Sequence, residues 1–139
     1  MESGVTNTKL DPDGEDRFQR LRAELGVTTF GLNLMRLRPG QGGRVHRHER
    51  QEEAYLVLEG TLTLEIEGEP RELPRGELVR VAPDVRRKLV NRHTALVLVL
   101  AIGGATEHEG RDGRAYESWD EEGAGRSPAD VPLPRDEAV

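Results

Sequence analysis

The chain has no cysteine, few aromatic residues and no long apolar run, and each absence excludes a class of protein. Without cysteine there can be no disulfide, no thiolate chemistry and no cysteine-ligated zinc. No stretch approaches the roughly 18 apolar residues of a transmembrane helix. Residues 1–16, MESGVTNTKLDPDGED, have neither the basic region nor the apolar segment of a signal peptide. We therefore expect a cytoplasmic protein that has no membrane partner.

Charge is unevenly distributed along the chain. Residues 1–104 are neutral, and residues 105–139 account for the whole net charge of −6. A neutral body with an acidic end does not attract a phosphate backbone, so we expect no nucleic-acid partner. Basic residues other than Lys9 and Lys88 are all arginine, a bias typical of a GC-rich genome, which indicates a bacterial source.

The length of 139 residues suits one domain. We expect residues 1–12 to be disordered. The segment GEDRFQRLRAELG then predicts a short amphipathic helix, because Phe18, Leu21 and Leu25 recur at spacings of three and four and Gly26 can cap its C-terminus.

From Val27 the hydrophobic period changes to two. About eight short strands follow, separated by glycine and proline turns, with no helix between them. In TLTLEIEG the apolar residues alternate with polar ones, which predicts one buried and one solvated face. The run TALVLVLAIGG is apolar on both faces and predicts a central strand. The pattern indicates an all-β antiparallel barrel or sandwich spanning residues 13–104 with its N-terminal helix. Residues 105–139 are expected to form a partly disordered extension that ends in a mobile acidic tail.

Two histidines lie one residue apart in RVHRHERQEEAY. Residues i and i+2 of a strand point to the same side, so His46 and His48 share a face. Glu53 begins the next strand. If these two strands pair, two imidazoles and one carboxylate meet at one point, which is the facial arrangement that binds Fe(II), Mn(II) and related ions. The alternative is a solvated, charged turn with incidental histidines.

The surrounding residues resemble a known family. At every spacing, the first signature of the cupin superfamily matches Gly40-x5-His46-x-His48-x4-Glu53-x6-Gly60. The second cupin signature has the form G-x5-P-x-G-x2-H-x3-N. Here it is approached by Gly76-x5-Ala82-x-Asp84-x2-Arg87-x3-Asn91, with departures at Ala82, Asp84 and Arg87.

This resemblance implies a double-stranded β-helix, the cupin jelly-roll barrel, with a small-molecule site in its mouth and a homodimeric assembly. It implies a divalent transition metal, Fe, Mn, Ni or Zn, on His46, His48 and Glu53. If the protein is an enzyme, the resemblance implies a metal-dependent dioxygenase or isomerase acting on a small, possibly anionic compound. The alternative is a metal-free, non-catalytic cupin that binds a small ligand.

Arg87 stands where metal-bearing cupins place a fourth ligand, and a guanidinium cannot donate a lone pair. Three arrangements remain open. Arg87 could reach past a three-ligand metal to hold an anionic substrate, because its fork suits carboxylates and phosphates. It could instead pair with Glu53 and replace the ion. It could also point outward and leave a degenerate site.

Further ligand-binding residues are expected around this cluster. Asn33 and Met35 are predicted to face the barrel interior from the first strand. Tyr55 shares the face of Glu53 and could donate a hydrogen bond to a ligand, although a core tyrosine is an equal alternative. Gln51 could enter if its turn folds inward. His93 and His108 are expected at the surface.

Overall fold

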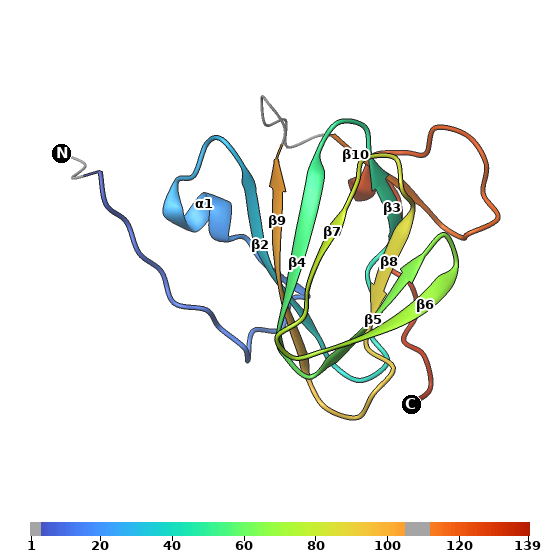
Figure 1. Ribbon diagram of the computed structural model, residues 1–139, viewed down its shortest axis with the longest axis horizontal. Helices are drawn as coiled ribbons and strands as arrows, with labels where there is room; N and C mark the ends of the chain where they lie inside the picture. The colour runs from blue at the N-terminus through green and yellow to red at the C-terminus, as the bar shows by residue number, and fades with distance from the viewer. Residues whose placement is uncertain (1–3, 105–111) are drawn as a thin grey trace.

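The computed structural model describes residues 4–104 and 112–139, which form two facing antiparallel sheets (Figure 1). The first sheet has the strand order β1-β2-β9-β4-β7, and the second has the order β10-β3-β8-β5-β6. The elements are β1 (Phe18–Gln19), α1 (Leu21–Leu25), β2 (Gly31–Leu37), β3 (Val45–His48), β4 (Glu52–Glu59), β5 (Thr61–Ile66), β6 (Glu69–Pro74), β7 (Leu78–Val81), β8 (Arg87–Val90), β9 (Val97–Gly104), β10 (Gly113–Tyr116) and the short 3-10 helix η1 (Pro128–Asp130).

The chain crosses repeatedly from one sheet to the other, and this crossing closes the barrel. One crossing is the turn between β4 and β5 at Gly60, whose φ of 74° favours glycine. A Cβ at this position would lie 2.4 Å from the carbonyl oxygen of Leu96, so the close approach of the two chain segments also requires glycine. The jelly-roll barrel expected from the sequence is therefore confirmed.

The core lies between the two sheets. Its residues come from alternate positions of the strands, as the period of two predicts. They include Met35, Leu37, Tyr55, Val57, Val97 and Val99 from the first sheet and Leu62, Leu64 and Leu89 from the second. Strand β9 pairs with β2 on one side and β4 on the other, which confirms the central strand predicted from its apolar sequence.

The predicted N-terminal helix is wrong over its first half. Phe18 forms part of strand β1 and pairs with Met35 of β2, and the helix α1 covers only Leu21–Leu25. The pairing satisfies backbone groups at the edge of β2 and directs Phe18 toward the core, so a tertiary contact overrides the helical spacing. Gly26 does cap the helix, with φ at 75°.

The barrel does not end at residue 104. Strand β10 pairs with β3, so the predicted C-terminal extension contributes a strand to the second sheet. Val131 is buried, and its carbonyl accepts a hydrogen bond from Arg44 Nε at 2.5 Å. The mobile tail is not confirmed, because the segment returns to the barrel, where the backbone N–H of Glu137 donates a hydrogen bond to the Gly40 carbonyl at 2.8 Å.

The ends of the chain also cover surfaces that were expected to be open. Thr63 and Glu65 of β5 are buried rather than solvated, because Trp119 donates a hydrogen bond to Glu65 Oε2 at 2.8 Å and Glu72 accepts one from Thr63. Residues 4–12, expected to be disordered, run beside α1, where Thr6 Oγ1 bonds the carbonyl of Leu25. No helix in the described part of the chain is both long and apolar enough to cross a membrane.

Candidate metal centre and adjoining cavity

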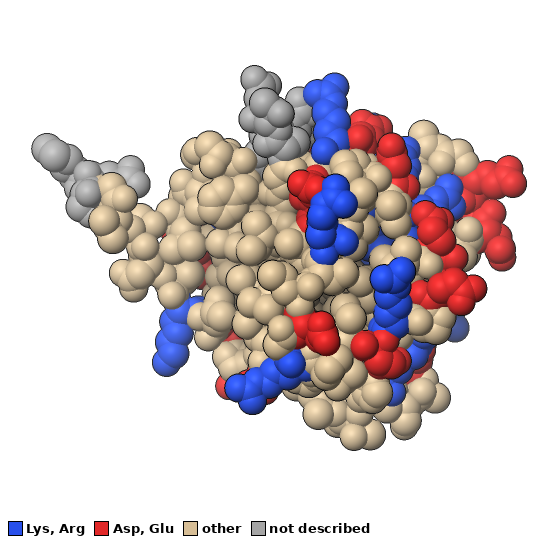
Figure 2. Space-filling view, in the orientation of Figure 1, with Lys and Arg blue, Asp and Glu red and all other residues tan. Residues whose placement is uncertain are grey.

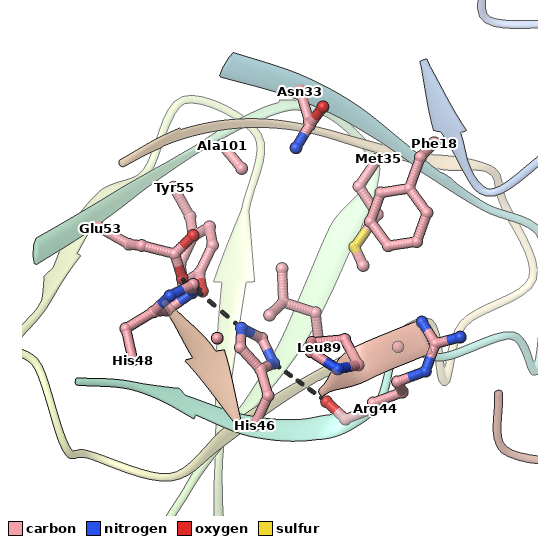
Figure 3. A pocket seen from close by; sticks show the side chains of 13 residues that line it. Phe18, Asn33, Met35, Arg44, His46, His48, Glu53, Tyr55, Leu89 and Ala101 are labelled. Atoms are coloured by element: carbon pink, nitrogen blue, oxygen red, sulfur yellow. Dashed lines mark hydrogen bonds and ion pairs between the residues drawn. The ribbon is translucent and has the colours of Figure 1, made fainter. Parts of the chain in front are cut away.

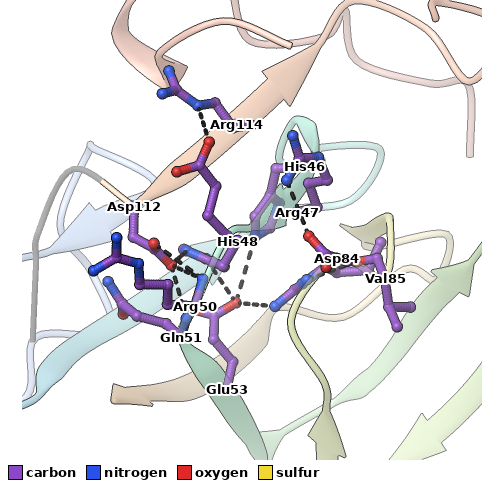
Figure 4. Close-up of polar contacts among 12 residues, drawn as sticks. His46, Arg47, His48, Arg50, Gln51, Glu53, Asp84, Val85, Asp112 and Arg114 are labelled. Carbon is purple, nitrogen blue, oxygen red and sulfur yellow. Dashed lines mark hydrogen bonds and ion pairs between the residues drawn. The ribbon is translucent and has the colours of Figure 1, made fainter. Parts of the chain in front are cut away.

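Two strands bring the predicted metal ligands together. His46 and His48 point inward from β3, and Glu53 points inward from β4 (Figures 3 and 4). The sequence suggested that these two strands pair, but β3 and β4 belong to opposite sheets. The histidines and the carboxylate therefore meet across the barrel interior. Arg87 of β8 lies directly opposite His46 in the ladder and joins the same cluster.

The Oε1 atom of Glu53 is the centre of this cluster. It lies 3.1 Å from His48 Nε2 and 3.5 Å from His46 Nε2. It also accepts hydrogen bonds from the Tyr55 hydroxyl at 2.5 Å and from Arg87 Nη2 at 2.9 Å. Burial opposes the charge of the Glu53 carboxylate. The two histidine rings favour the charged form by more than burial disfavours it, so the pKa of Glu53 lies well below its usual range.

Arg87 is fully buried and held by three groups. Besides Glu53, it bonds the Tyr55 hydroxyl through Nε at 3.2 Å and the Val85 carbonyl through Nη1 at 2.6 Å. Burial lowers the pKa of Arg87, but its interactions with Tyr55 and Glu53 raise it by more. An outward-pointing Arg87 is therefore wrong, and the pairing with Glu53 expected as one alternative is what the structure shows.

Tyr55 is fixed by the same contacts. Burial, followed by the charge of Glu53, raises the pKa of Tyr55 well above its usual value. Its hydroxyl remains protonated at physiological pH and donates its hydrogen to the carboxylate. The expected role of Tyr55 as a hydrogen-bond donor thus has Glu53 as its partner within the protein.

Each histidine has an oxygen near its second ring nitrogen. The Arg44 carbonyl lies 3.1 Å from His46 Nδ1, so a proton on Nδ1 leaves the Nε2 lone pair facing Glu53. Asp112 Oδ2 lies 3.6 Å from His48 Nδ1, slightly beyond hydrogen-bond distance, and this buried nitrogen has no other partner among the described residues. These oxygens direct both Nε2 atoms to the same point.

The three ligand atoms fit a divalent metal ion. They all lie within 4.8 Å of one another. Ligands about 2.1 Å from a metal ion lie about 3.0 Å apart in octahedral and about 3.4 Å apart in tetrahedral geometry. The measured separations of 3.1 and 3.5 Å from Glu53 Oε1 to His48 and His46 match these values. The donor set of two imidazoles and one carboxylate suits Fe, Mn, Ni or Zn.

No sequence pattern linked Asp112 to this region. Its carboxylate is buried and accepts hydrogen bonds from the backbone N–H groups of Arg50 and Gln51, at 3.0 and 2.8 Å to Oδ2 (Figure 4). It therefore fixes the turn between β3 and β4, which carries the metal ligands on either side. The aspartate directly precedes β10, a strand that the sequence pattern did not predict.

A cavity of about 220 Å³ adjoins the cluster (Figure 3). It is smaller than the roughly 300–1,000 Å³ of sites for drug-sized ligands, so it suits a small molecule. Asn33 and Met35 line it, as expected from the first strand. The wall also includes Phe18, Arg44, His46, His48, Glu53, Tyr55, Leu89 and Ala101. Arg87 does not line the cavity, because it lies behind Glu53.

A second cavity, of about 440 Å³, adjoins the first. Asn33, His48, Glu53 and Ala101 line both cavities. Gln51 lines only the second cavity and is buried, so the turn does fold inward as one expectation required. The second cavity is further lined by Arg20, directly before α1, and by Arg22 of α1, which no sequence pattern connected with the site.

The remaining expectations concern the second signature and the other histidines. Asp84, at the usual glycine position, has φ at 67°, which explains why the signature prefers glycine there. Asn91 is buried and donates hydrogen bonds to the carbonyls of Leu37 and Ala95. His93 lies in an exposed turn beside Glu72, as expected. His108 lies outside the described residues.

The fold and the cluster define a double-stranded β-helix protein with two histidines and a glutamate in its barrel. The sequence profile of the cupin domain matches residues 33–103, just over half of the chain. The chain belongs to the cupin family. A search of the curated proteins found no match.

Solved structures support the same assignment of fold. A cupin protein from Bacteroides fragilis has a TM-score of 0.64 and 24% identity, over 75% of this chain and 86% of that chain. A cupin 2 conserved barrel domain protein from Salinispora arenicola has a TM-score of 0.58 and 25% identity, over 69% of this chain and 81% of that chain. A sugar phosphate isomerase from a cupin superfamily, from Silicibacter pomeroyi, has a TM-score of 0.59 and 32% identity. That match covers 63% of this chain and 57% of the isomerase.

Proposed function

We propose that the protein binds a divalent transition metal on His46, His48 and Glu53 and a small ligand in the cavity beside it. The observation that carries this proposal is the convergence of two histidine Nε2 atoms on Glu53 Oε1, at 3.1 and 3.5 Å. Three lone pairs facing one another repel unless a proton or a cation lies between them. A metal ion meets that requirement with all three ligands at once.

The residues around the cluster define what a ligand would encounter. Phe18, Met35 and Leu89 form an apolar part of the wall of the smaller cavity. Asn33 offers an amide that can donate and accept hydrogen bonds. When bound, a divalent metal with three protein ligands supplies an open coordination position and a Lewis acid to a small ligand.

Arg87 limits how tightly this site holds a metal. Its guanidinium is fixed 2.9 Å from the ligand oxygen of Glu53 and cannot swing away, because two further hydrogen bonds hold it. The positive charge compensates the carboxylate that a metal would otherwise neutralise. We therefore expect weaker metal binding than a fourth histidine at this position would give.

The same ion pair favours a second candidate function, a metal-free cupin that binds a small ligand without catalysis. In that case Arg87, behind Glu53, neutralises the carboxylate and Glu53 needs no metal. The hydrogen bond from Arg87 Nη2 to Glu53 Oε1 supports this alternative. The two candidates differ in one measurable property, the metal content of the protein.

Metal content decides between them. We expect untagged protein, purified without a chelator, to carry close to one equivalent of Fe, Mn, Ni or Zn by elemental analysis. The His46→Ala variant should lose it, with metal affinity falling by more than about 100-fold, because removing even an outer partner of a ligand costs about 10- to 100-fold. His93→Ala is the matched control, since His93 lies in an exposed turn.

The Arg87→His variant separates the two candidates further. If the wild type binds metal, a histidine at this position adds a fourth ligand and raises the affinity. If the wild type is free of metal but Arg87→His acquires it, the ion pair has replaced the ion and the metal-free candidate is correct. Absence of metal from both proteins would leave no support for the metal site.

For a metal-loaded protein, isomerisation is the reaction to test first. The reason is the 32% identity with a cupin described as a sugar phosphate isomerase, although the match covers only 57% of that chain. Oxygen consumption with small acids tests the dioxygenase alternative in the same preparation.

A further inference from the structure

Two arginines at the start of α1, Arg20 directly before the helix and Arg22 within it, line the larger cavity and have no partner among the described residues. Arg20 and Arg22 both face the cavity of about 440 Å³ that adjoins the histidine cluster. Neither guanidinium makes a hydrogen bond or an ion pair with any residue in the described part of the chain. The Nε atom of Arg22 is buried, and a buried N–H without an acceptor is unfavourable. Two unpaired guanidiniums at a cavity wall leave an anion-binding position open.

The neighbouring acids cannot neutralise these arginines. Glu24 is the acidic residue of α1, and its carboxylate accepts hydrogen bonds from Thr8 Oγ1 at 2.6 Å and Gln19 Nε2 at 3.1 Å. Glu53 is the one carboxylate among the described residues that line this cavity. Its charge is already matched by Arg87 at 2.9 Å. The cavity therefore carries a net positive charge from the α1 arginines.

The positively charged wall of the larger cavity lies next to the histidine cluster. His48, Glu53, Asn33 and Ala101 line both cavities, so a molecule bound by α1 can extend past the histidine cluster into the smaller, apolar cavity. The guanidinium that sequence reasoning assigned to an anionic ligand, Arg87, is fully buried behind Glu53 and lines neither cavity. Charge recognition must therefore come from another element.

We propose that Arg20 and Arg22 bind the oxyanion, a phosphate or a carboxylate, of a small molecule whose remaining part enters the apolar cavity beside His46 and His48. The proposal rests on the proposed function in one respect, that the barrel accepts a small ligand. Guanidinium groups bind oxyanions through parallel N–H donors, which a lysine cannot reproduce. The ligand class is a small molecule with an anionic group at one end and an apolar or weakly polar body.

The test measures anion affinity by calorimetry with the full chain, using inorganic phosphate and, separately, acetate as probes. We expect Arg22→Gln and Arg20→Gln each to lower the affinity for the preferred anion about tenfold, because each removes charge-assisted hydrogen bonds. Arg75→Gln, an equal change of charge in an exposed turn, should leave it unchanged. The stronger of the two probes distinguishes a phosphate ligand from a carboxylate ligand.

Arg22→Lys guards against a folding defect, because it keeps the charge and most of the side chain. We expect it to bind the anion more weakly than the wild type and more tightly than Arg22→Gln. Failure of the wild type to bind either anion would overturn the proposal. So would an unchanged affinity in the Arg20→Gln/Arg22→Gln double variant, or a loss confined to Arg44→Gln, which would place the anion at the smaller cavity.

Metal content measured on the same samples separates this proposal from the proposed function. If the Arg20→Gln/Arg22→Gln double variant loses anion binding but retains metal, the result supports both the oxyanion site and the metal centre. A wild type without metal that still loses anion binding on substitution of Arg20 and Arg22 would contradict the metal centre and support the oxyanion site. A wild type that carries metal, and whose anion affinity does not change on substitution of Arg20 and Arg22, would support the metal centre and contradict the oxyanion site.

Discussion

At the scale of single residues, one carboxylate oxygen determines the character of the site. Glu53 Oε1 receives hydrogen bonds from Tyr55 and Arg87 on one side and faces two imidazole nitrogens on the other. These two donors fix the position of the carboxylate. The side facing His46 and His48 is the one available to a metal. A permanent cation behind the ligand distinguishes this site from one completed by a third histidine.

The ion pair between Arg87 and Glu53 is expected to matter strongly for folding. Arg87→Met should lower the free energy of unfolding by about 3–5 kcal/mol, because it leaves Glu53 as an uncompensated, nearly buried charge. Urea denaturation of metal-free protein measures this loss. Arg75→Met, in an exposed turn, should change stability by no more than about 0.5 kcal/mol.

A double variant shows whether the charge is the cause. Adding Glu53→Gln to Arg87→Met removes the buried charge that the single variant leaves behind, so we expect most of the stability to return. Equal losses in the single and double variants would show that packing around the Arg87 side chain, and not the ion pair, accounts for the effect.

At the scale of elements, the turn between β3 and β4 connects the two sheets at the metal centre. Asp112 holds this turn through the backbone N–H groups of Arg50 and Gln51 and lies 3.6 Å from His48 Nδ1. The residue comes from the segment just before β10, so a strand late in the chain controls the geometry of ligands far earlier in it.

We expect Asp112→Ala to weaken both the fold and the metal site. Two backbone donors lose their acceptor, which should lower the free energy of unfolding by about 1–3 kcal/mol. The turn and His48 are then less well oriented, so metal affinity should fall about 10- to 100-fold. Denaturation and metal titration measure these effects. Asp120→Ala, which alters an exposed aspartate nearby, is the control. A loss of stability with unchanged metal affinity would contradict the orienting role.

At the scale of the whole molecule, the outer face of the first sheet is apolar. Cross-strand partners place Leu78, Leu56 and Leu100 in one row across β7, β4 and β9, and the row ends at Leu34 of β2, which is fully buried in a cluster with Leu21 of α1. Leu78 is 64% exposed, and Ile102 of the next row is 38% exposed. In Figure 2 the charged side chains gather toward the right, and a broad uncharged area covers the left, where β2, β9 and α1 lie.

This face is where we expect the homodimer implied by the cupin resemblance to form. An exposed apolar face of this extent is typical of an interaction surface, and a second copy presents an identical one. Light scattering after gel filtration should give a dimer for the wild type and a monomer for the Leu78→Lys/Ile102→Lys double variant. Glu69→Lys, an exposed change on β6 of the other sheet, should remain dimeric. A monomeric wild type would contradict this expectation.

Local sequence patterns predicted most of the strands and the three residues of the cluster. Alternation in β2 and β5 predicted the inward faces, and the spacing of His46, His48 and Glu53 predicted three residues that do converge. The same patterns failed for Phe18, whose helical spacing gave way to pairing with β2. They also failed for β10, because the burial of its four residues depends on their pairing with β3, which is distant in the sequence.

What the sequence determined by itself is the class of fold and the identity of the clustered ligands, because hydrophobic period, turn residues and signature spacings are local properties of the chain. Only the tertiary structure decided that Glu53 meets the histidines across the barrel and that Arg87 lies buried behind it. It also decided that the α1 arginines line the larger cavity. These arrangements depend on which strands face one another and on which charged groups form pairs. The spacing of neighbouring residues in the sequence determines neither.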